Sequence, residues 1–181
     1  MEQTKGAIRP QRRIKKQVVA GFVIYRRTSE GIKFLLLYRR GNYWNFPKGH
    51  FDRGENSIAT ALRETEEETG IKKSELRIIS GFRTYEQFYF HRGDQKIHDT
   101  VILYLAETHK ADIKIAAREH SGFAWFLYKD AIRVLGDKYS ATQEVLKQAH
   151  DFIYRRHSRH RLNKQNLRIT TKKHFQEKIR F

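Results

Sequence analysis

The stretch that decides the fold runs from Gly49 to Ile71 and reads GHFDRGENSIATALRETEEETGI. It holds five glutamates between residues 55 and 68, although the whole chain carries a formal net charge of +17. Residues 56–69 have a helical pattern, and Gly70 is a natural stop because glycine tolerates the left-handed backbone that ends many helices. A helix over this range therefore brings several acids onto one side.

The spacing of the acids gathers three carboxylates. Each residue of a helix advances by about 100°, so Glu64, Glu67 and Glu68 fall within an arc of roughly 100°. Such neighbours repel one another unless a cation binds or one of them takes up a proton. Oxygen ligands of this kind suit Mg²⁺ or Mn²⁺. The predicted buried face lies beside this arc and consists of Ile58, Ala61, Leu62, Thr65 and Thr69.

The alternative interpretation, which composition alone favours, is a solvated acidic helix face. Two local features weigh against it. Gly49 and Gly54 permit a tight loop immediately before the helix. Arg63 lies among the acids, where a guanidinium can pair with a carboxylate and fix its orientation. The spacing by itself predicts a divalent-cation site and no more.

A longer pattern carries a family resemblance. It consists of Gly49, Glu55 and then Arg63-Glu64-Thr65-Glu66-Glu67-Glu68-Thr69-Gly70-Ile71. This pattern resembles the box of the Nudix hydrolase superfamily and meets each of its fixed positions. It departs only at Thr65, where an aliphatic residue is usual. The resemblance implies an α+β fold of the Nudix type, an α/β/α sandwich with a mixed β-sheet. It also implies a hydrolase acting on a nucleoside diphosphate linked to another group.

Three further segments resemble one branch of that superfamily, the diadenosine tetraphosphate hydrolases. They are WNFPKGH before the box, TVILYLAE after it and AREHSGFAWF further on. The resemblance covers roughly residues 18–154. The PKGH segment recurs with variation in other nucleotide-cleaving Nudix groups, so it is less specific than the box.

The resemblance also implies roles for individual residues. Glu64, Glu67 and Glu68 match the metal ligands of the family, and the backbone carbonyl of Lys48 adds a ligand. Arg63, together with Glu55, supports the geometry of the loop and the helix. One more carboxylate outside the box helps with metal or water. Its candidates are Glu107 and Glu119, between which the sequence does not choose.

Basic and aromatic residues are the candidates for substrate contact. Lys48 and His50 lie beside the box glycine and are expected to meet a phosphate chain. In the aromatic run, strand alternation places Tyr85 and Tyr89 on one face and Phe88 and Phe90 on the other. One set is expected in the core, while the other, represented by Tyr85 or Phe88, stacks on a purine. The resemblance places Tyr139 as a second stacking ring, although packing within the domain is the alternative for all such rings.

Composition bounds the rest of the interpretation. The chain has 181 residues and no cysteine, which excludes disulfides and suits a cytoplasmic location. No apolar run approaches the ~18 residues of a membrane helix. Residues 1–17 hold six Lys/Arg and one acid, and residues 155–181 hold ten and one, whereas residues 18–154 hold 21 and 18. We therefore expect a globular domain over 18–154 between two basic arms, which are solvated charge or a weak, salt-dependent surface for RNA or other polyanions.

The remaining elements follow from periodicity and turn signals. Strands are predicted over 18–27 and 32–40 as a hairpin, with a loop over 41–50. Residues 76–90 and 98–108 are strand-rich, and 122–135 begins as a strand and becomes a short helix. A capping signal at Ser140 opens a last helix. Because strands and helices alternate irregularly, the class is α+β with a mixed sheet.

Three functions are compatible with these features. The first is metal-dependent hydrolysis of diadenosine tetraphosphate to ATP and AMP. The second is the same machinery acting on a nucleoside diphosphate sugar, on ADP-ribose or on the 5′ end of RNA. The third is a non-catalytic module that binds nucleotide or RNA, for which three intact carboxylates would be superfluous. The sequence predicts Mg²⁺ or Mn²⁺ as cofactor and leaves the oligomeric state open.

Overall fold

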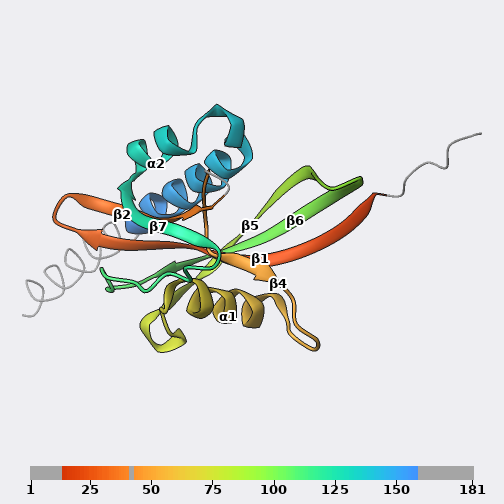
Figure 1. Cartoon of the computed structure of the whole chain (residues 1–181). Coiled ribbons are helices and arrows are strands. Elements are labelled where there is room, and N and C mark those ends of the chain that lie inside the picture. The colour runs from red at the N-terminus through yellow and green to blue at the C-terminus, as the bar shows by residue number, and fades with distance from the viewer. Residues whose placement is uncertain (1–13, 41–42, 159–181) are drawn as a thin grey trace, which may run out of the picture.

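A mixed seven-stranded sheet forms the centre of the molecule (Figure 1). The computed structural model describes residues 14–40 and 43–158. The strands are β1 (Lys15–Thr28), β2 (Gly31–Arg39), β3 (Tyr43–Asn45), β4 (Lys48–His50), β5 (Arg77–Arg92), β6 (Gln95–Glu107) and β7 (His120–Leu127). The main path is β3-β2-β1-β6-β5, with β4 paired to β1 and β7 to β2. β1 and β6 run parallel, whereas the other pairs of described strands are antiparallel.

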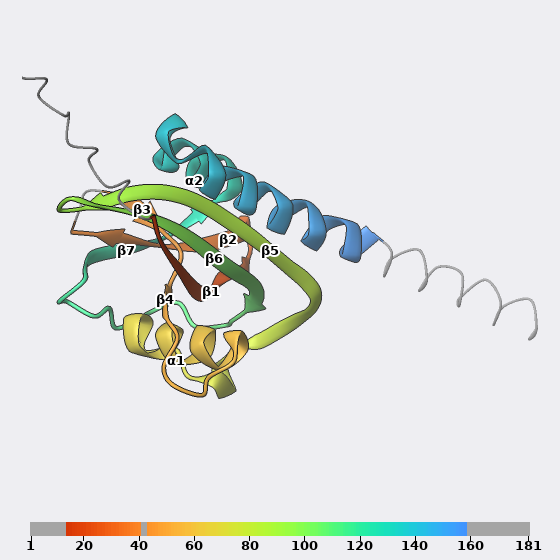
Figure 2. The same ribbon diagram turned by 90° about the vertical axis from the view of Figure 1, so that its right-hand side faces the viewer.

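Helices cover both faces of this sheet (Figure 2). Helix α1 (Ser57–Thr69) lies on one face, and α2 (Tyr128–Leu135) lies on the other with a helix over residues 140–158. Two short 3₁₀ turns, η1 (Lys73–Glu75) and η2 (Asp137–Tyr139), complete the described elements. Each face has its own hydrophobic cluster, one containing Phe22 and Ala61, the other Val23 and Leu146. The expected α/β/α sandwich with a mixed sheet is confirmed.

The central strand β1 has an apolar sequence because both of its faces are covered. β1 is buried without interruption from Val19 to Tyr25, because a strand with helices on both faces has no solvent side and reads as a continuous apolar run. The predicted hairpin with β2 is present, and Thr28 pairs with Gly31 at its turn. Gly31 has φ +131°, a backbone conformation that side chains disfavour.

The segment 41–50 was expected to be a loop, and in this respect the sequence interpretation was wrong. Within its described part, β3 adds to β2 and β4 adds to β1. The approach of β4 requires Gly21, because a Cβ there would lie 2.1 Å from the carbonyl oxygen of Pro47. The same oxygen accepts a hydrogen bond of 3.2 Å from the backbone N–H of Phe22. Strands of three residues are too short to show a period-2 pattern. β3 and β4 form because β2 and β1 offer edges to which they pair.

The helices begin and end near the expected positions. Asn56 caps α1 by accepting a hydrogen bond of 2.9 Å from the backbone N–H of Ala59. Gly70 ends it in the left-handed conformation, with φ +68°. The last helix begins at residue 140 and continues to 158, the last described residue. The domain limits of 18 and 154 stay a prediction, and most of both basic arms lies outside the described residues.

Candidate active site

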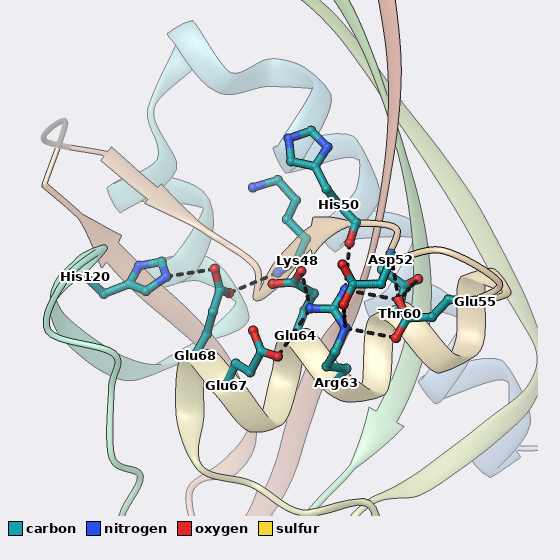
Figure 3. Close-up of polar contacts among 10 residues, drawn as sticks. All are labelled: Lys48, His50, Asp52, Glu55, Thr60, Arg63, Glu64, Glu67, Glu68 and His120. Atoms are coloured by element: carbon teal, nitrogen blue, oxygen red, sulfur yellow. Dashed lines mark hydrogen bonds and ion pairs between the residues drawn. The ribbon is translucent and has the colours of Figure 1, made fainter.

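Arg63 joins the loop before α1 to the acids on the helix (Figure 3). Its Nε lies 2.9 Å from Glu55 Oε1 and its Nη1 lies 2.8 Å from Glu64 Oε1. Its Nη2 donates to the backbone carbonyl of His50 at 2.7 Å. A guanidinium holds several acceptors in fixed directions because its donors lie in one plane. Arg63 therefore fixes the position of β4 relative to Glu64.

Glu55 is committed to the same loop. Its Oε2 accepts hydrogen bonds from the Thr60 hydroxyl at 2.7 Å and from the backbone N–H of Asp52 at 3.1 Å. Hydrogen bonds from Arg63, then from Thr60 and Asp52, lower the pKa of Glu55 to about 2. An acid that is charged and fully partnered in this way holds a loop in place. The supporting role that the family resemblance implies for Glu55 stays a prediction, with which these contacts agree.

Glu64 packs directly beneath the glycine of the loop. A Cβ at Gly49 would lie 2.0 Å from the carboxyl carbon of Glu64, so only glycine permits this approach of strand and carboxylate. Burial raises the pKa of Glu64, and the charges of Glu68 and Glu67 raise it further, against the lowering effect of Arg63. The acids are thus close enough to disfavour one another's charge.

Glu68 is the most enclosed of the three carboxylates. It is 4% exposed, and its Oε2 accepts a hydrogen bond of 3.0 Å from the backbone N–H of Lys48. Its other oxygen, Oε1, lies 3.1 Å from Nε2 of His120. Glu68 therefore contacts β4 on one side and the start of β7 on the other, as Figure 3 shows.

The three box carboxylates open into one cleft. This cleft has a volume of about 500 Å³ and is lined by Glu64, Glu67, Glu68, Ala116, Arg118 and Glu119. Arg39 also reaches its rim, because its Nη2 lies 3.4 Å from Glu119 Oε2. Four carboxylates therefore lie beside the guanidinium groups of Arg39, Arg63 and Arg118, an arrangement that suits a cation-bound polyanion.

The residues present fit a hard divalent cation. Glu64, Glu67 and Glu68 are all carboxylates from one helix face, and Glu64 has a pKa raised by burial and by its acidic neighbours. A bound cation relieves that repulsion, and oxygen donors are the ligands that Mg²⁺ and Mn²⁺ prefer. The ligand set that the resemblance implies stays a prediction.

Lys48 and His50 lie on the opposite side of β4 from α1. Figure 3 shows both side chains pointing together, away from the helix that carries the acids. Burial lowers the pKa of Lys48, although Glu68 and Glu86 act in the opposite direction. Burial also raises the pKa of Glu86 and of Asp99. Both acids lie on the face of the sheet that α2 covers, so this face carries a second set of charges.

The two alternative stacking rings of β5, Tyr85 and Phe88, lie on opposite faces of the sheet. Tyr85 is 52% exposed and lies under the guanidinium of Arg83, 5.1 Å from its ring centre. Phe88 is half-buried on the other face of β5 and packs against the core cluster beneath α2. Tyr139 stacks on Tyr43 with ring centres 5.5 Å apart. Tyr85 and Phe88 thus remain alternatives, and the stacking of either of them, or of Tyr139, on a purine stays a prediction.

The two candidate acids outside the box are also separated. Glu119 lines the cleft, whereas Glu107 belongs to a different cluster. The carboxylate of Glu107 accepts hydrogen bonds of 3.0 Å from both Tyr25 and Arg27, and it also pairs with Arg77. The geometry thus brings Glu119, and not Glu107, to the box.

Sequence reasoning missed several residues of this site. Arg39, Arg118 and His120 come from β2, from the loop before β7 and from β7 itself. The segment AREH contained the signal for two of them, since an arginine and a histidine flank Glu119 there. Glu86 and Asp99 gave no signal, because alternation along a strand shows which residues share a face but not what faces them.

The family model of the NUDIX domain matches residues 15–149, and the chain belongs to the Nudix family. The asymmetrical bis(5′-nucleosyl)-tetraphosphatase of Mus musculus is 38% identical over 142 residues, which cover 74% of this chain and 92% of that relative. The crystal structure of a C. elegans Ap4A hydrolase binary complex has a TM-score of 0.66 and 30% identity, covering 76% of this chain and 98% of the other. The RNA pyrophosphohydrolase of Pelagibacter ubique is 28% identical over 116 residues, covering 58% and 72%.

The family defines the chemistry in general terms. The chain is a Nudix hydrolase acting on phosphoanhydride bonds, and such enzymes generally use divalent cations such as Mg²⁺ or Mn²⁺. Among the residues that the structure describes, no helix has the length and apolar character needed to cross a membrane.

Proposed function

We propose that this protein hydrolyses diadenosine tetraphosphate to ATP and AMP with the help of Mg²⁺ or Mn²⁺. The observation that carries this proposal is the cleft of about 500 Å³, in which the box carboxylates meet Arg118 and Glu119. The similarity to asymmetrical tetraphosphatases supports the choice of substrate. Water adds to one phosphorus, the bridging P–O bond breaks, and the two nucleotides leave.

The residues of the cleft divide the work. Glu64, Glu67 and Glu68, with the backbone carbonyl of Lys48, hold the cation, which when bound neutralises phosphate charge. Glu119 lines the same cleft and takes the proton from the attacking water as a general base. Arg63 holds Glu64 and β4 in fixed positions relative to each other. Arg39 and Arg118 contact phosphate oxygens.

Lys48 and His50 are proposed to contact phosphates further from the bond that breaks. Two such contacts suit a chain of four phosphates better than the two of ADP-ribose. Lys48→Ala removes a charge-assisted contact worth roughly 1.5–3 kcal/mol. We therefore expect it to raise KM for diadenosine tetraphosphate more than KM for ADP-ribose. Equal effects on both substrates, measured by steady-state kinetics, would place Lys48 at a phosphate that both ligands share.

The substrate is tested by product analysis in ¹⁸O-water with diadenosine tetraphosphate, ADP-ribose and a 5′-triphosphorylated RNA. ATP plus AMP at the highest kcat/KM supports the proposal. Faster cleavage of ADP-ribose to AMP and ribose phosphate would reassign the substrate while leaving the hydrolase chemistry in place. Faster release of pyrophosphate from RNA would favour the second candidate, for which the basic arms and the RNA pyrophosphohydrolase relative are the supporting observations.

A cytoplasmic location, weak binding of RNA or another polyanion through the basic arms, and self-association remain predictions from the sequence. The absence of cysteine and the charge of the two arms support the first two. A single size-exclusion measurement with light scattering reports the oligomeric state of the full chain.

A further inference from the structure

The β5–β6 hairpin and the start of β1 continue beyond α1, and one face of the sheet is left uncovered there (Figure 1). Helix α1 reaches as far as Tyr104 of β6, whose hydroxyl lies 2.6 Å from Ser57 Oγ. From that level onward, alternate residues of β5 are exposed, while those between them are buried or half-buried against the other side. We call this uncovered surface the open face. Its main side chains are Lys16, Arg83, Tyr85, Tyr89, Lys96 and His98.

Two tyrosines of the open face have more than half of their surface in solvent. Tyr85 is 52% exposed and Tyr89 is 58% exposed, although an aromatic ring gains much from burial. The two residues are four positions apart on one strand, which separates them by about 13 Å. Val18, opposite Thr100 on the neighbouring strands, is exposed as well. Apolar groups that gather on one exposed face, unlike scattered ones, indicate a binding surface.

Cations lie beside both rings. The guanidinium of Arg83 is 5.1 Å from the ring centre of Tyr85, and the Lys96 ammonium is 4.8 Å from that of Tyr89. His98 stacks on Tyr89 with ring centres 4.6 Å apart and 18° between the planes. The strand register places Lys16 of β1 next to His98 on its other side. Aromatic and basic groups thus alternate across three strands.

The open face is also free of acids among the strand residues that the structure describes. The acids within residues 83–92 and 95–100 are Glu86 and Asp99, and both are buried on the side that α2 covers. Residues 1–13, which precede this face along the chain, add four Lys/Arg and one acid. Positive charge without neighbouring acids attracts a polyanion.

We propose that the open face binds single-stranded nucleic acid, whose bases stack on Tyr85 and Tyr89 and whose phosphates contact the surrounding cations. Aromatic rings interleaved with basic groups suit a single strand, because its bases present free faces for stacking and its backbone is negative. Hydrolysis of a small nucleotide plays no part in this binding, and the inference goes beyond it. None of the residues that line the cleft belongs to β5 or β6. Phe88, on the other face, is then the ring of β5 that is left for a purine of the small substrate.

The test is fluorescence anisotropy of a labelled oligouridylate with a 5′-hydroxyl end, which contains no anhydride for the enzyme to cleave. In the full chain, Tyr85→Ala and Tyr89→Ala should each weaken binding by about 5-fold or more, because a base loses its stacking partner. Phenylalanine at either position should restore the wild-type Kd. Tyr154→Ala is the matched control, since Tyr154 is 51% exposed on the last helix, and its Kd should equal that of wild type. Alanine variants that bind like wild type, or a wild-type chain that does not bind at low salt, overturn the inference.

Salt dependence separates stacking from charge. Tyr85→Ala should leave the slope of log Kd against log salt concentration unchanged. Lys96→Gln should reduce that slope by about 0.7, the value for one phosphate of a single strand. An abasic chain of the same length should bind wild type and Tyr85→Ala equally. If Tyr85→Ala weakens the abasic chain as much as oligouridylate, the ring does not stack on a base and the inference fails.

Two further ligands locate the strand and identify its source. A non-hydrolysable analogue of diadenosine tetraphosphate, added in excess with Mg²⁺, should not displace oligouridylate. Displacement would place the nucleic acid in the catalytic cleft and overturn the inference. Tighter binding of oligouridylate than of oligothymidylate identifies RNA as the ligand, whereas the reverse identifies DNA, and both results support a single-strand surface. Turnover of diadenosine tetraphosphate is measured separately, so failure of this surface and failure of the proposed function are distinguishable.

Discussion

Glu67 is the most exposed of the three box carboxylates. Its side chain is 59% exposed, compared with 14% for Glu64 and 6% for Glu68. Among residues 14–40 and 43–158 its polar contact is an approach of 3.3 Å to Arg63, so its carboxylate contributes little to the fold and faces the cleft. The expected contribution of Glu67 is therefore the negative charge of its carboxylate at the cleft.

Glu67→Gln removes that charge while keeping the shape. We expect the melting temperature to stay nearly constant and kcat to fall by a factor on the order of 10² or more, because a metal ligand loses its charge. Glu66→Gln is the matched control, since Glu66 is an exposed neighbour on the same helix that does not line the cleft. Unchanged turnover of Glu67→Gln under saturating Mg²⁺ would exclude Glu67 as a ligand. Wild-type activity that survives excess EDTA would exclude Glu64, Glu67 and Glu68 together as ligands of an essential metal.

The choice between Glu119 and Glu107 gives a second prediction for single residues. Glu119→Gln should lower kcat by roughly 10²–10⁴, the range expected when a general base is lost. Glu107→Gln should leave kcat per folded molecule within a few-fold, because Glu107 contacts Tyr25 and Arg27 instead of the cleft. Steady-state kinetics on both variants in Mg²⁺ decides the matter, and the opposite ranking would move the base to Glu107.

The residues that the sequence identified and those that it missed differ in one physical respect. Glu64, Glu67 and Glu68 lie on one helix, so spacing alone predicts their neighbourhood. Glu119 and His120 lie near Glu68 because β7 pairs with β2 and because the backbone N–H of Ala116 donates to the carbonyl of Glu68 at 3.1 Å. No local rule relates those segments, and the choice between Glu119 and Glu107 therefore needed the structure.

Among the elements, three strands are tied together at Glu107. Tyr25 and Arg27 come from β1, Arg77 from β5 and Glu107 from β6. Although burial favours the neutral acid, hydrogen bonds from Arg77 and Tyr25 lower the pKa of Glu107. Burial, then the charge of Glu107, raises the pKa of Tyr25 to about 12. The carboxylate is therefore more stable ionised in the folded protein than in the unfolded chain.

This network predicts a pH dependence of stability. Because the folded pKa of Glu107 lies below the unfolded value of about 4.3, its stabilisation is complete above that value and is lost as the pH falls through the folded pKa. Glu107→Gln should lower the free energy of unfolding at pH 7 by roughly 1.5–3 kcal/mol. The difference from wild type should shrink as the pH falls below about 4. Urea unfolding at pH 7, 5, 4 and 3 measures it.

The comparison for this experiment is Glu30→Gln. Glu30 pairs with Lys33 at 2.8 Å, but its side chain is 64% exposed, and surface pairs contribute little. Its removal should change stability by less than about 1 kcal/mol at each pH. A Glu107→Gln deficit that stays constant from pH 7 to pH 3 would show that packing, not ionisation, accounts for the loss.

Long elements were predictable and short ones were not. The alternation in β5 appears as expected, with Tyr85 and Tyr89 exposed and Phe88 partly buried. The ends of α1 follow from Asn56 and Gly70. By contrast, β3 and β4 have three residues each. The pairing of β4 with β1 depends on the absence of a side chain at Gly21, which no local pattern in β4 indicates.

At the scale of the whole molecule, the charge is distributed unevenly along the chain. Residues 155–181 hold ten basic residues and one acid, and those from 159 onward lie outside the described structure. We predict that deleting 159–181 leaves turnover of small nucleotides within a few-fold, because neither the box nor the cleft lies there. Binding to RNA should weaken and depend less steeply on salt, because fewer phosphates are neutralised.

Filter binding at several salt concentrations, beside a kinetic assay of the same truncated chain, makes that measurement. A variant with the lysines and arginines of 159–181 changed to glutamine is the matched control for length. If the truncated chain unfolds, as read by circular dichroism, the segment is part of the domain and the limit at 154 is misplaced. Equal salt dependence of RNA binding in the full-length and the truncated protein would show that residues outside 159–181 bind the polyanion.

The parallel pairing of β1 with β6 joins two segments that are synthesised far apart in time. Val19 pairs with Val101, so the central strand leaves the ribosome long before its partner exists. Parallel strands need a long crossover, and distant pairings slow folding because the loop must close before the contact forms. Helix α1 therefore emerges while the sheet beneath it is still incomplete, with its carboxylates in water. We therefore expect the cleft to be completed late, because Ala116, Arg118 and Glu119 line it and are made well after α1.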